Sequence, residues 1–353
     1  MEILVLFATL FLLIVIGVPV GFAIGGATII ALYYCTDLDM VITAQYCYSG
    51  VNSFTILSIP FFMLAGSIMS TGGIAKRIVA FAKSLIGAVT GGLGAVAVLA
   101  SCFFGAISGS GMATTSAIGG MLIPEMRKEG YDVPYSTTLI CFAGTVGPII
   151  PPSISFIMYG VVTGTSISDL FIAGVFPGLL MGLGYLVMNW YMSRKYGFGT
   201  VTVDEVKEKT KRHVLNRLKA VGKATWEGKW ALLSPVIILG GIYSGIFTPT
   251  EAACVSVVYS VIVSLFVYRE MTLKDIYRVL AETAVLNGIT SFMLAYSTVF
   301  STFLNFAQIP TQIYEAIIGF TDSKVVFLLI VNLVLLVLVY FVTRRLSDDE
   351  PLR

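Results

Sequence analysis

The chain has 353 residues, of which 57% are hydrophobic and only 12% are charged, and its mean hydropathy is +0.90. A soluble core of this length does not need so much apolar surface, so the composition excludes an ordinary soluble domain and predicts an all-α polytopic membrane protein. The net charge is only +2. The largest basic block, within 207–229, is mixed with acidic residues, which argues against a nucleic-acid-binding arm and against nucleic acid as a partner.

Apolar segments that approach or exceed the roughly 20 residues needed to cross a bilayer recur along the chain. They lie at 3–18, 20–34, 53–70, 134–161, 168–193, 230–247, 250–268 and 284–306. The first segment has no basic flank before it, and a second apolar run follows it directly. We therefore expect it to be a membrane helix and not a cleaved leader.

Segment 91–124 has two apolar arms with a polar, glycine-rich centre at 105–111. Basic residues precede it within 76–83 and follow it at Arg127 and Lys128, so the positive-inside rule places both ends on the cytoplasmic side. This pattern predicts a re-entrant hairpin. Two ordinary helices joined by a glycine-rich outer loop would give the same charges, but each arm, at about 14 to 17 residues, is short for a full span.

Segment 134–161 contains a run of glycines and prolines at 144–153, which predicts a broken helix. Pro148, Pro151 and Pro152 each remove a helix donor. Broken helices leave carbonyl oxygens for a hard cation and positive helix N-termini for an anion. Neither this centre nor the hairpin centre holds Asp, Glu or His, which favours a sodium ion over a proton relay; a kink needed only for packing is the alternative.

Segment 200–229 combines charged residues with apolar ones near helical spacing, which predicts an amphipathic cytoplasmic linker helix. Such a helix would lie along the inner leaflet with membrane lipid as its partner, and a solvated linker helix fits equally well. The linker divides the chain into a first repeat, 1–199, and a second repeat, 230–353.

The two predicted repeats share short motifs. Gly17-Val18-Pro19 resembles Phe247-Thr248-Pro249 at an offset of 230 positions, and segment 74–78 resembles 309–313 at an offset of 235. By the charge rule, the first helix pair turns inside and the second turns outside. Similarity with opposite orientation indicates an inverted-topology repeat, which is typical of secondary transporters.

Other function classes fit less well. The predicted spans lack a Ser-His or Ser-Lys dyad, paired aspartates and an HExxH helix, so we expect no enzyme. A channel is disfavoured because inverted repeats with interrupted helices serve alternating access.

Four motifs together resemble the large membrane (permease) subunit of tripartite ATP-independent periplasmic (TRAP) transporters. They occur in the family's order at 17–23 (GVPVGFA), 59–66 (IPFFMLAG), 104–111 (FGAISGSG) and 144–153 (GTVGPIIPPS). The resemblance implies an inverted-repeat, elevator-type transporter in a bacterial or archaeal inner membrane. It also implies two partners, a small four-helix membrane subunit and a periplasmic substrate-binding protein, and sodium-coupled import of small organic anions such as C4-dicarboxylates or sialic acid.

The resemblance also implies a site. It places a sodium ion at Ser108, Gly109, Ser110, Gly144, Thr145 and Gly147, and it places substrate contacts at Ser110, Pro151, Pro152 and Ser153.

The end of the chain departs from the family pattern. Segment 325–339 reads as the first arm of a second hairpin, and by the offset of 235 Leu338 corresponds to Phe103, just before the tip. A charged tail follows, so we expect a C-terminal truncation with an incomplete second hairpin. Two alternatives stay open: a truncated subunit that only binds partners, and a stand-alone sodium-coupled elevator carrier.

Overall fold

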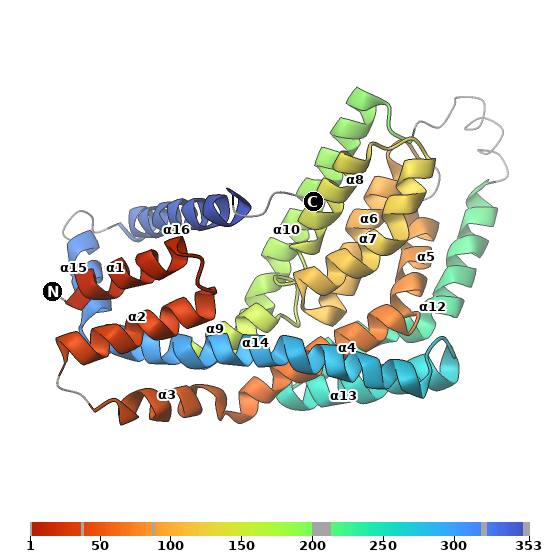
Figure 1. The fold of residues 1–353 in the computed structure, drawn as a ribbon. Coiled ribbons are helices and arrows are strands. Elements are labelled where there is room, and N and C mark those ends of the chain that lie inside the picture. Colours follow the sequence, from red (N-terminus) through yellow and green to blue (C-terminus); the bar gives the residue numbers. More distant parts are fainter. Residues whose placement is uncertain (1, 37–38, 87–88, 200–212, 319–322, 349–353) are drawn as a thin grey trace. The chain divides into compact units, whose positions relative to one another are not determined.

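The computed structural model describes residues 2–36, 39–86, 89–199, 213–318 and 323–348, and every regular element within them is helical (Figure 1). The α-helices are α1 (Glu2–Val15), α2 (Val20–Cys35), α3 (Val41–Val51), α4 (Ser58–Thr71), α5 (Ile74–Ile86), α6 (Gly92–Ser108), α7 (Gly111–Lys128), α8 (Val133–Gly144), α9 (Ile154–Thr163), α10 (Ile167–Tyr196), α12 (His213–Tyr243), α13 (Pro249–Ile262), α14 (Leu273–Phe306), α15 (Ile309–Ile318) and α16 (Lys324–Asp348). A 3₁₀ turn (Phe54–Leu57) precedes α4, and a π-helical turn (Val263–Val267) extends α13.

Four helical segments in the described part of the chain are long and apolar enough to cross a membrane. They are Phe54–Thr71, Ile167–Tyr196, Pro249–Val267 and Leu273–Phe306. The predicted spans at 3–18 and 20–34 form the shorter helices α1 and α2, with 14 and 16 residues. The fold is therefore that of an all-α, multi-pass membrane protein, as the composition predicts.

The chain forms two compact units. One comprises Ser53–Gly288, and the other combines Met1–Asn52 with Ile289–Arg353. This division runs across the predicted repeats and does not test them. The predicted linker 200–229 lies partly outside the described residues, because the structure resumes with α12 at His213.

Some elements occur in the same order in the two predicted repeats, whose inverted arrangement stays a prediction. Helices α2 and α13 both begin beside a proline, Pro19 and Pro249, and follow α1 and α12. The short helices α5 and α15 then precede α6 and α16. Helix α6 ends at Ser108, whereas α16 continues to Asp348, beyond the position that corresponds to the hairpin tip.

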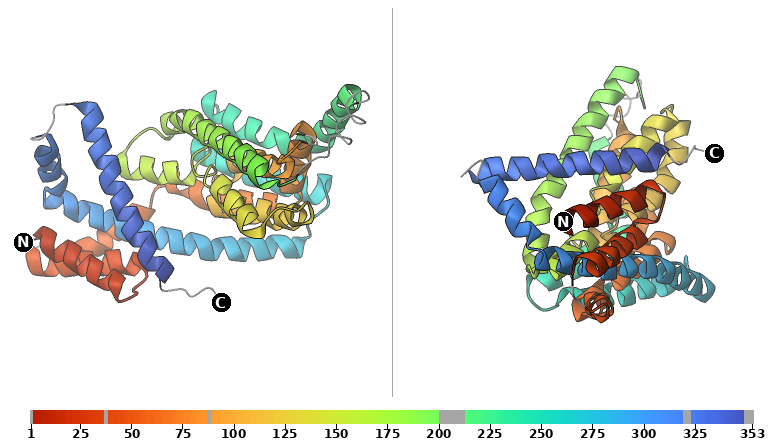
Figure 2. Two further views of the ribbon diagram at one scale, coloured as in Figure 1. Left: turned by 90° about the horizontal axis from the view of Figure 1, so that it is seen from above. Right: turned by 60° about the vertical axis from the view of Figure 1, so that its left-hand side comes forward.

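In the unit of Met1–Asn52 and Ile289–Arg353, α1 and α2 lie side by side (Figure 2). Leu6 of α1 packs with Ala27 and Ala31 of α2 and with Phe303 of α14. Gly25 is essential to this packing, because a Cβ there would overlap the Tyr296 ring.

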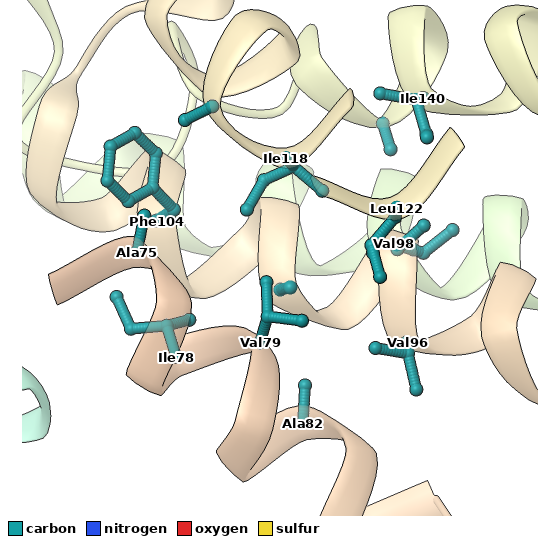
Figure 3. Packing of buried hydrophobic residues seen from close by; sticks show 14 of the residues in the cluster. Ala75, Ile78, Val79, Ala82, Val96, Val98, Phe104, Ile118, Leu122 and Ile140 are labelled. Carbon is teal, nitrogen blue, oxygen red and sulfur yellow. The ribbon is translucent and has the colours of Figure 1, made fainter. Parts of the chain in front are cut away.

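The core of the unit Ser53–Gly288 is built on α5. Its buried residues recur at helical spacing, which gives one apolar face against the hairpin arms α6 and α7. Figure 3 shows Ala75, Ile78, Val79 and Ala82 on this face, opposite residues of α6 and α7 that include Phe104. The core therefore supports the hairpin from the side of α5.

One ion pair fixes the start of α5. Nη1 of Arg77 lies 2.6 Å from Oε1 of Glu270, and the guanidinium lies 3.6 Å from the centre of the Tyr268 ring. Both charged side chains are only partly exposed, with 24% and 30% of their side-chain surface accessible. The pair links the α4–α5 turn to the segment that follows the π-helical turn.

Arg77→Gln is expected to lower the free energy of unfolding by about 1–2 kcal/mol, because it removes an ion pair and a cation–π contact together. The measurement is unfolding of the purified protein in mixed micelles. Lys223→Gln is the control: its pair with Glu227 is 3.8 Å long and its side chain is 76% exposed, so the change should be below about 0.5 kcal/mol. Equal changes in the free energy of unfolding for the two substitutions would contradict the stabilising role assigned to the Arg77–Glu270 pair.

Candidate functional site

The tip of the helical hairpin consists of Gly109 and Ser110. Helix α6 ends when Gly109 adopts a left-handed conformation with φ of 61°, and its N–H donates to the Gly105 carbonyl at 2.9 Å. Ser110 begins α7 as its N-cap, because its hydroxyl accepts from the Ala113 N–H at 3.3 Å. Two helices thus meet at a two-residue turn where the sequence predicts the hairpin tip. Re-entry into a membrane stays a prediction.

Buried hydroxyl and carbonyl oxygens gather at this tip. The Ser108 and Thr114 hydroxyls lie 3.0 Å apart, and neither side chain is exposed. The Thr114 hydroxyl also donates to the Ser110 carbonyl at 2.8 Å. The tip is therefore an arrangement of neutral oxygens held in fixed positions.

The broken helix consists of α8 and α9 with residues 145–153 between them. Ser153 begins α9: its hydroxyl accepts from the Phe156 N–H at 3.1 Å and donates to the Pro148 carbonyl. Thr145, at the other end of the break, is exposed. Its hydroxyl donates to the Phe142 carbonyl at 2.7 Å and lies 3.1 Å from the Tyr185 hydroxyl of α10.

The hairpin tip and the broken helix pack backbone against backbone. A Cβ on Gly105 would lie 2.8 Å from Cα of Gly147, and a Cβ on Gly147 would lie 3.0 Å from the Ser110 carbonyl oxygen. The Ile154 N–H, at the start of α9, donates to the Gly109 carbonyl at 3.4 Å. Glycine is needed here because any side chain would separate the two segments.

The structure thus brings five of the six predicted sodium residues together, namely Ser108, Gly109, Ser110, Gly144 and Gly147. The side chain of the sixth, Thr145, instead makes its hydrogen bonds to Phe142 and to Tyr185. Thr114 was not among the predicted site residues, yet it bonds to two tip residues. Its spacing of four from Ser110 is the signal that could have revealed it.

The predicted substrate residues differ in accessibility. Pro151, Pro152 and Ser153 are buried, and Ser110 is half-buried. Both hydrogen-bonding roles of the Ser153 hydroxyl are already taken within its own segment. Of this set, Ser110 is therefore the side chain best placed to meet a ligand.

The donor set suits a hard monovalent cation. Hydroxyl and carbonyl oxygens are ligands for such ions, and the carboxy-terminal ends of half-helices supply them in membrane transporters. Within the described ranges, no group of three or more His, Cys, Asp or Glu residues could hold a metal ion. The neutral oxygens at this junction include the hydroxyls of Ser108, Ser110 and Thr114 and the Gly144 carbonyl, and a sodium ion bound to them stays a prediction.

An open cleft of about 520 Å³ lies beside the tip. Residues of α7, of α8 and of the break that follows α8 line it, among them Gly111, Thr115, Gly144 and Pro148. The cleft makes the start of α7 accessible from the surface of the protein.

The base of the hairpin is held by Asn189 of α10, which is only 2% exposed. Its amide donates to the Gly91 carbonyl at 2.9 Å, and its Oδ1 accepts from the Tyr135 hydroxyl at 3.0 Å. A Cβ on Gly94 would overlap the same amide. Asn189 therefore ties the starts of α6 and α8 to α10.

Comparison with known proteins defines the class of protein to which this fold and site belong. Residues 7–345 match the family described as the tripartite ATP-independent periplasmic transporter, DctM component. The chain belongs to this family, whose members are transporter permeases and not enzymes.

Three relatives illustrate the similarity. The isethionate TRAP transporter permease protein DctMQ of Oleidesulfovibrio alaskensis is 38% identical over 335 residues, which cover 95% of this chain and 51% of that protein. A putative TRAP transporter large permease protein of Haemophilus influenzae is 37% identical, with coverage of 96% and 77%. The C4-dicarboxylate TRAP transporter large permease protein DctM of Pseudomonas aeruginosa is 43% identical over 284 residues, with coverage of 80% and 64%. The chain thus matches between about half and three quarters of the length of these relatives.

Proposed function

We propose that this chain carries small organic anions across the bacterial inner membrane as the large permease component of a TRAP transporter, driven by a sodium gradient. The observation that carries the proposal is the cluster of buried, neutral oxygens where the hairpin tip packs on the broken helix. A sodium ion bound there would join the two segments through Ser108, Ser110 and the Gly144 carbonyl. Sodium binding would then stabilise the arrangement in which the hairpin tip contacts the broken helix.

The proposed substrates are small organic anions, with C4-dicarboxylates and other carboxylates as the first candidates. Relatives are named for isethionate, sialic acid, 2,3-diketo-L-gulonate and C4-dicarboxylates, and all of these compounds are anionic. The N-termini of α7 and α9 lie at the same place in the site, and helix N-termini attract negative charge. Ser110 at the first of them is the proposed substrate contact.

The proposed partners are a small four-helix membrane subunit and a periplasmic binding protein, as in the resemblance described above. The proposed movement is of the elevator type. It is supported by the backbone packing between hairpin and broken helix, since segments that interlock so closely must move together.

Ser108→Ala is expected to weaken the apparent sodium affinity by about tenfold, because one oxygen ligand and its link to Thr114 are lost. The measurement is uptake of a labelled C4-dicarboxylate into proteoliposomes that hold the complete transporter, at increasing external sodium. Sodium-induced thermal stabilisation of the purified chain reports binding independently of transport. Thr145→Ala shows whether the Thr145 hydroxyl belongs to the same set.

Thr71→Ala is the control, because the Thr71 hydroxyl is exposed and bonds only to its own helix at Ser67. Uptake and stabilisation that depend on sodium equally in Ser108→Ala and in the control would rule out the proposed cation site. Uptake that needs no sodium gradient would rule out sodium coupling.

A further inference from the structure

Two exposed tryptophans and a half-buried lysine form a cluster on α12, at the point where its charged portion gives way to its apolar portion. The Trp226 side chain is 71% exposed and Trp230 is 38% exposed. Nζ of Lys229 lies 3.6 Å from the Trp226 ring centre and 5.6 Å from that of Trp230. We call these three residues the α12 Trp–Lys cluster.

An apolar stripe continues from the cluster along the same helix. Leu233 is 38% exposed and Val236 is 63% exposed. Trp226, Trp230, Leu233 and Val236 follow one another at steps of four, three and three residues, which places the four side chains on one side of α12. On the other side of the cluster, Lys219 and Lys223 are exposed. The face therefore changes from basic to aromatic to aliphatic, which is the order of chemistry across one leaflet of a membrane.

Lys229 has no acidic partner among the described residues, whereas its neighbour Lys223 pairs with Glu227 at 3.8 Å. Within the described part of the chain, the contacts of the Lys229 ammonium at the aromatic boundary are therefore with the two indole rings. An anion would complete the cluster, and the indole N–H groups could donate to the same anion.

The C-terminal end of α10 also places basic side chains against aromatic rings. Arg194 of α10 lies 4.4 Å from the ring centre of Trp190, and Lys195 lies 5.3 Å from that of Tyr196. Both helix ends carry basic residues, so the positive-inside rule assigns them to the cytoplasmic face. The leaflet on that side is the one in which anionic lipids attract basic segments.

We propose that the α12 Trp–Lys cluster binds an anionic phospholipid. The phosphate would lie against Lys229 between the two indoles, and an acyl chain would follow Leu233 and Val236. This site is separate from the proposed sodium and substrate site, so it does not depend on that function.

Tryptophan fluorescence can test the site directly because the chain has only 3 tryptophans. Trp190→Phe leaves Trp226 and Trp230 as the only indoles. This variant is reconstituted into vesicles in which a fixed fraction of the lipid is brominated, as phosphatidylglycerol in one set and as phosphatidylcholine in the other. Brominated phosphatidylglycerol is expected to be enriched about five-fold at the indoles, which corresponds to about 1 kcal/mol for one basic residue.

Lys229→Gln should remove the enrichment, and the matched control Lys223→Gln should keep it. Equal quenching by the two lipids, or equal loss in both lysine variants, would overturn the proposal. Native mass spectrometry of the chain that retains Trp190 is a second measurement. It does not depend on whether the Trp190→Phe variant folds. Retained phosphatidylglycerol that disappears with Lys229→Gln supports the site, and retention unaffected by Lys229→Gln overturns it.

Discussion

Replacing Gly109 with alanine is expected to lower the free energy of unfolding by about 3 kcal/mol and to abolish uptake. A non-glycine residue at a φ of 61° costs about 1–2 kcal/mol. The added Cβ would also overlap the Pro152 carbonyl oxygen, and relief of such overpacking costs about 1–3 kcal/mol. Uptake should fail because the tip can no longer reach the broken helix. Unfolding in mixed micelles and uptake into proteoliposomes measure the two effects.

Gly120→Ala is the matched control in the second arm of the same hairpin. No atom lies within 4 Å of a Cβ at Gly120, and alanine in a helix interior is favoured over glycine by up to about 1 kcal/mol. The control should therefore be neutral or more stable. Equal free energies of unfolding for the two alanine variants would contradict the close packing of the hairpin tip on residues 145–153.

The interruptions of the helices could be predicted from the sequence, because glycine and proline act locally. Prolines at 148, 151 and 152 end α8 wherever the rest of the chain lies, and a serine after glycine is a local signal for the start of α7. In the structure two of the glycines serve a further purpose, because Gly105 and Gly147 allow two backbones to touch. This close approach joins segments that are far apart in the sequence, so a local sequence pattern cannot predict it.

The same distinction explains which of the predicted site residues lie together in the structure. Ser108 and Ser110 belong to one turn, so their proximity follows from the chain itself. Thr145 was grouped with them, but its side chain bonds to Tyr185, forty positions away on α10. Asn189 escaped notice because a single polar residue in an apolar segment carries no periodic signal, although its burial makes it important.

Asn189→Leu is expected to lower the free energy of unfolding by about 1–3 kcal/mol. Leucine has a similar volume but cannot hydrogen-bond, so two hydrogen bonds are lost: the one to the Gly91 carbonyl, which keeps its bond from the Ala95 N–H, and the one from the Tyr135 hydroxyl. Each such bond contributes about 0.5–1.5 kcal/mol. Asn332→Leu is the control, because Asn332 is exposed on α16 and bonds only to its own helix at Leu328. Its effect should stay within about 0.5 kcal/mol.

A double-mutant cycle with Tyr135→Phe separates this hydrogen bond from general damage. If the amide and the phenol act together, the cost of Asn189→Leu should fall by about 0.5–3 kcal/mol in the Tyr135→Phe background. Hydrogen exchange should also accelerate at the start of α6, where Gly91 and Gly94 depend on the amide. Additive costs with unchanged exchange would mean that α10 does not hold the hairpin base. A coupled cost would mean that the hairpin is fastened at both ends, to the broken helix through the glycine contacts and to α10 through Asn189. The proposed elevator movement requires such a connection, because these segments would have to move as one body.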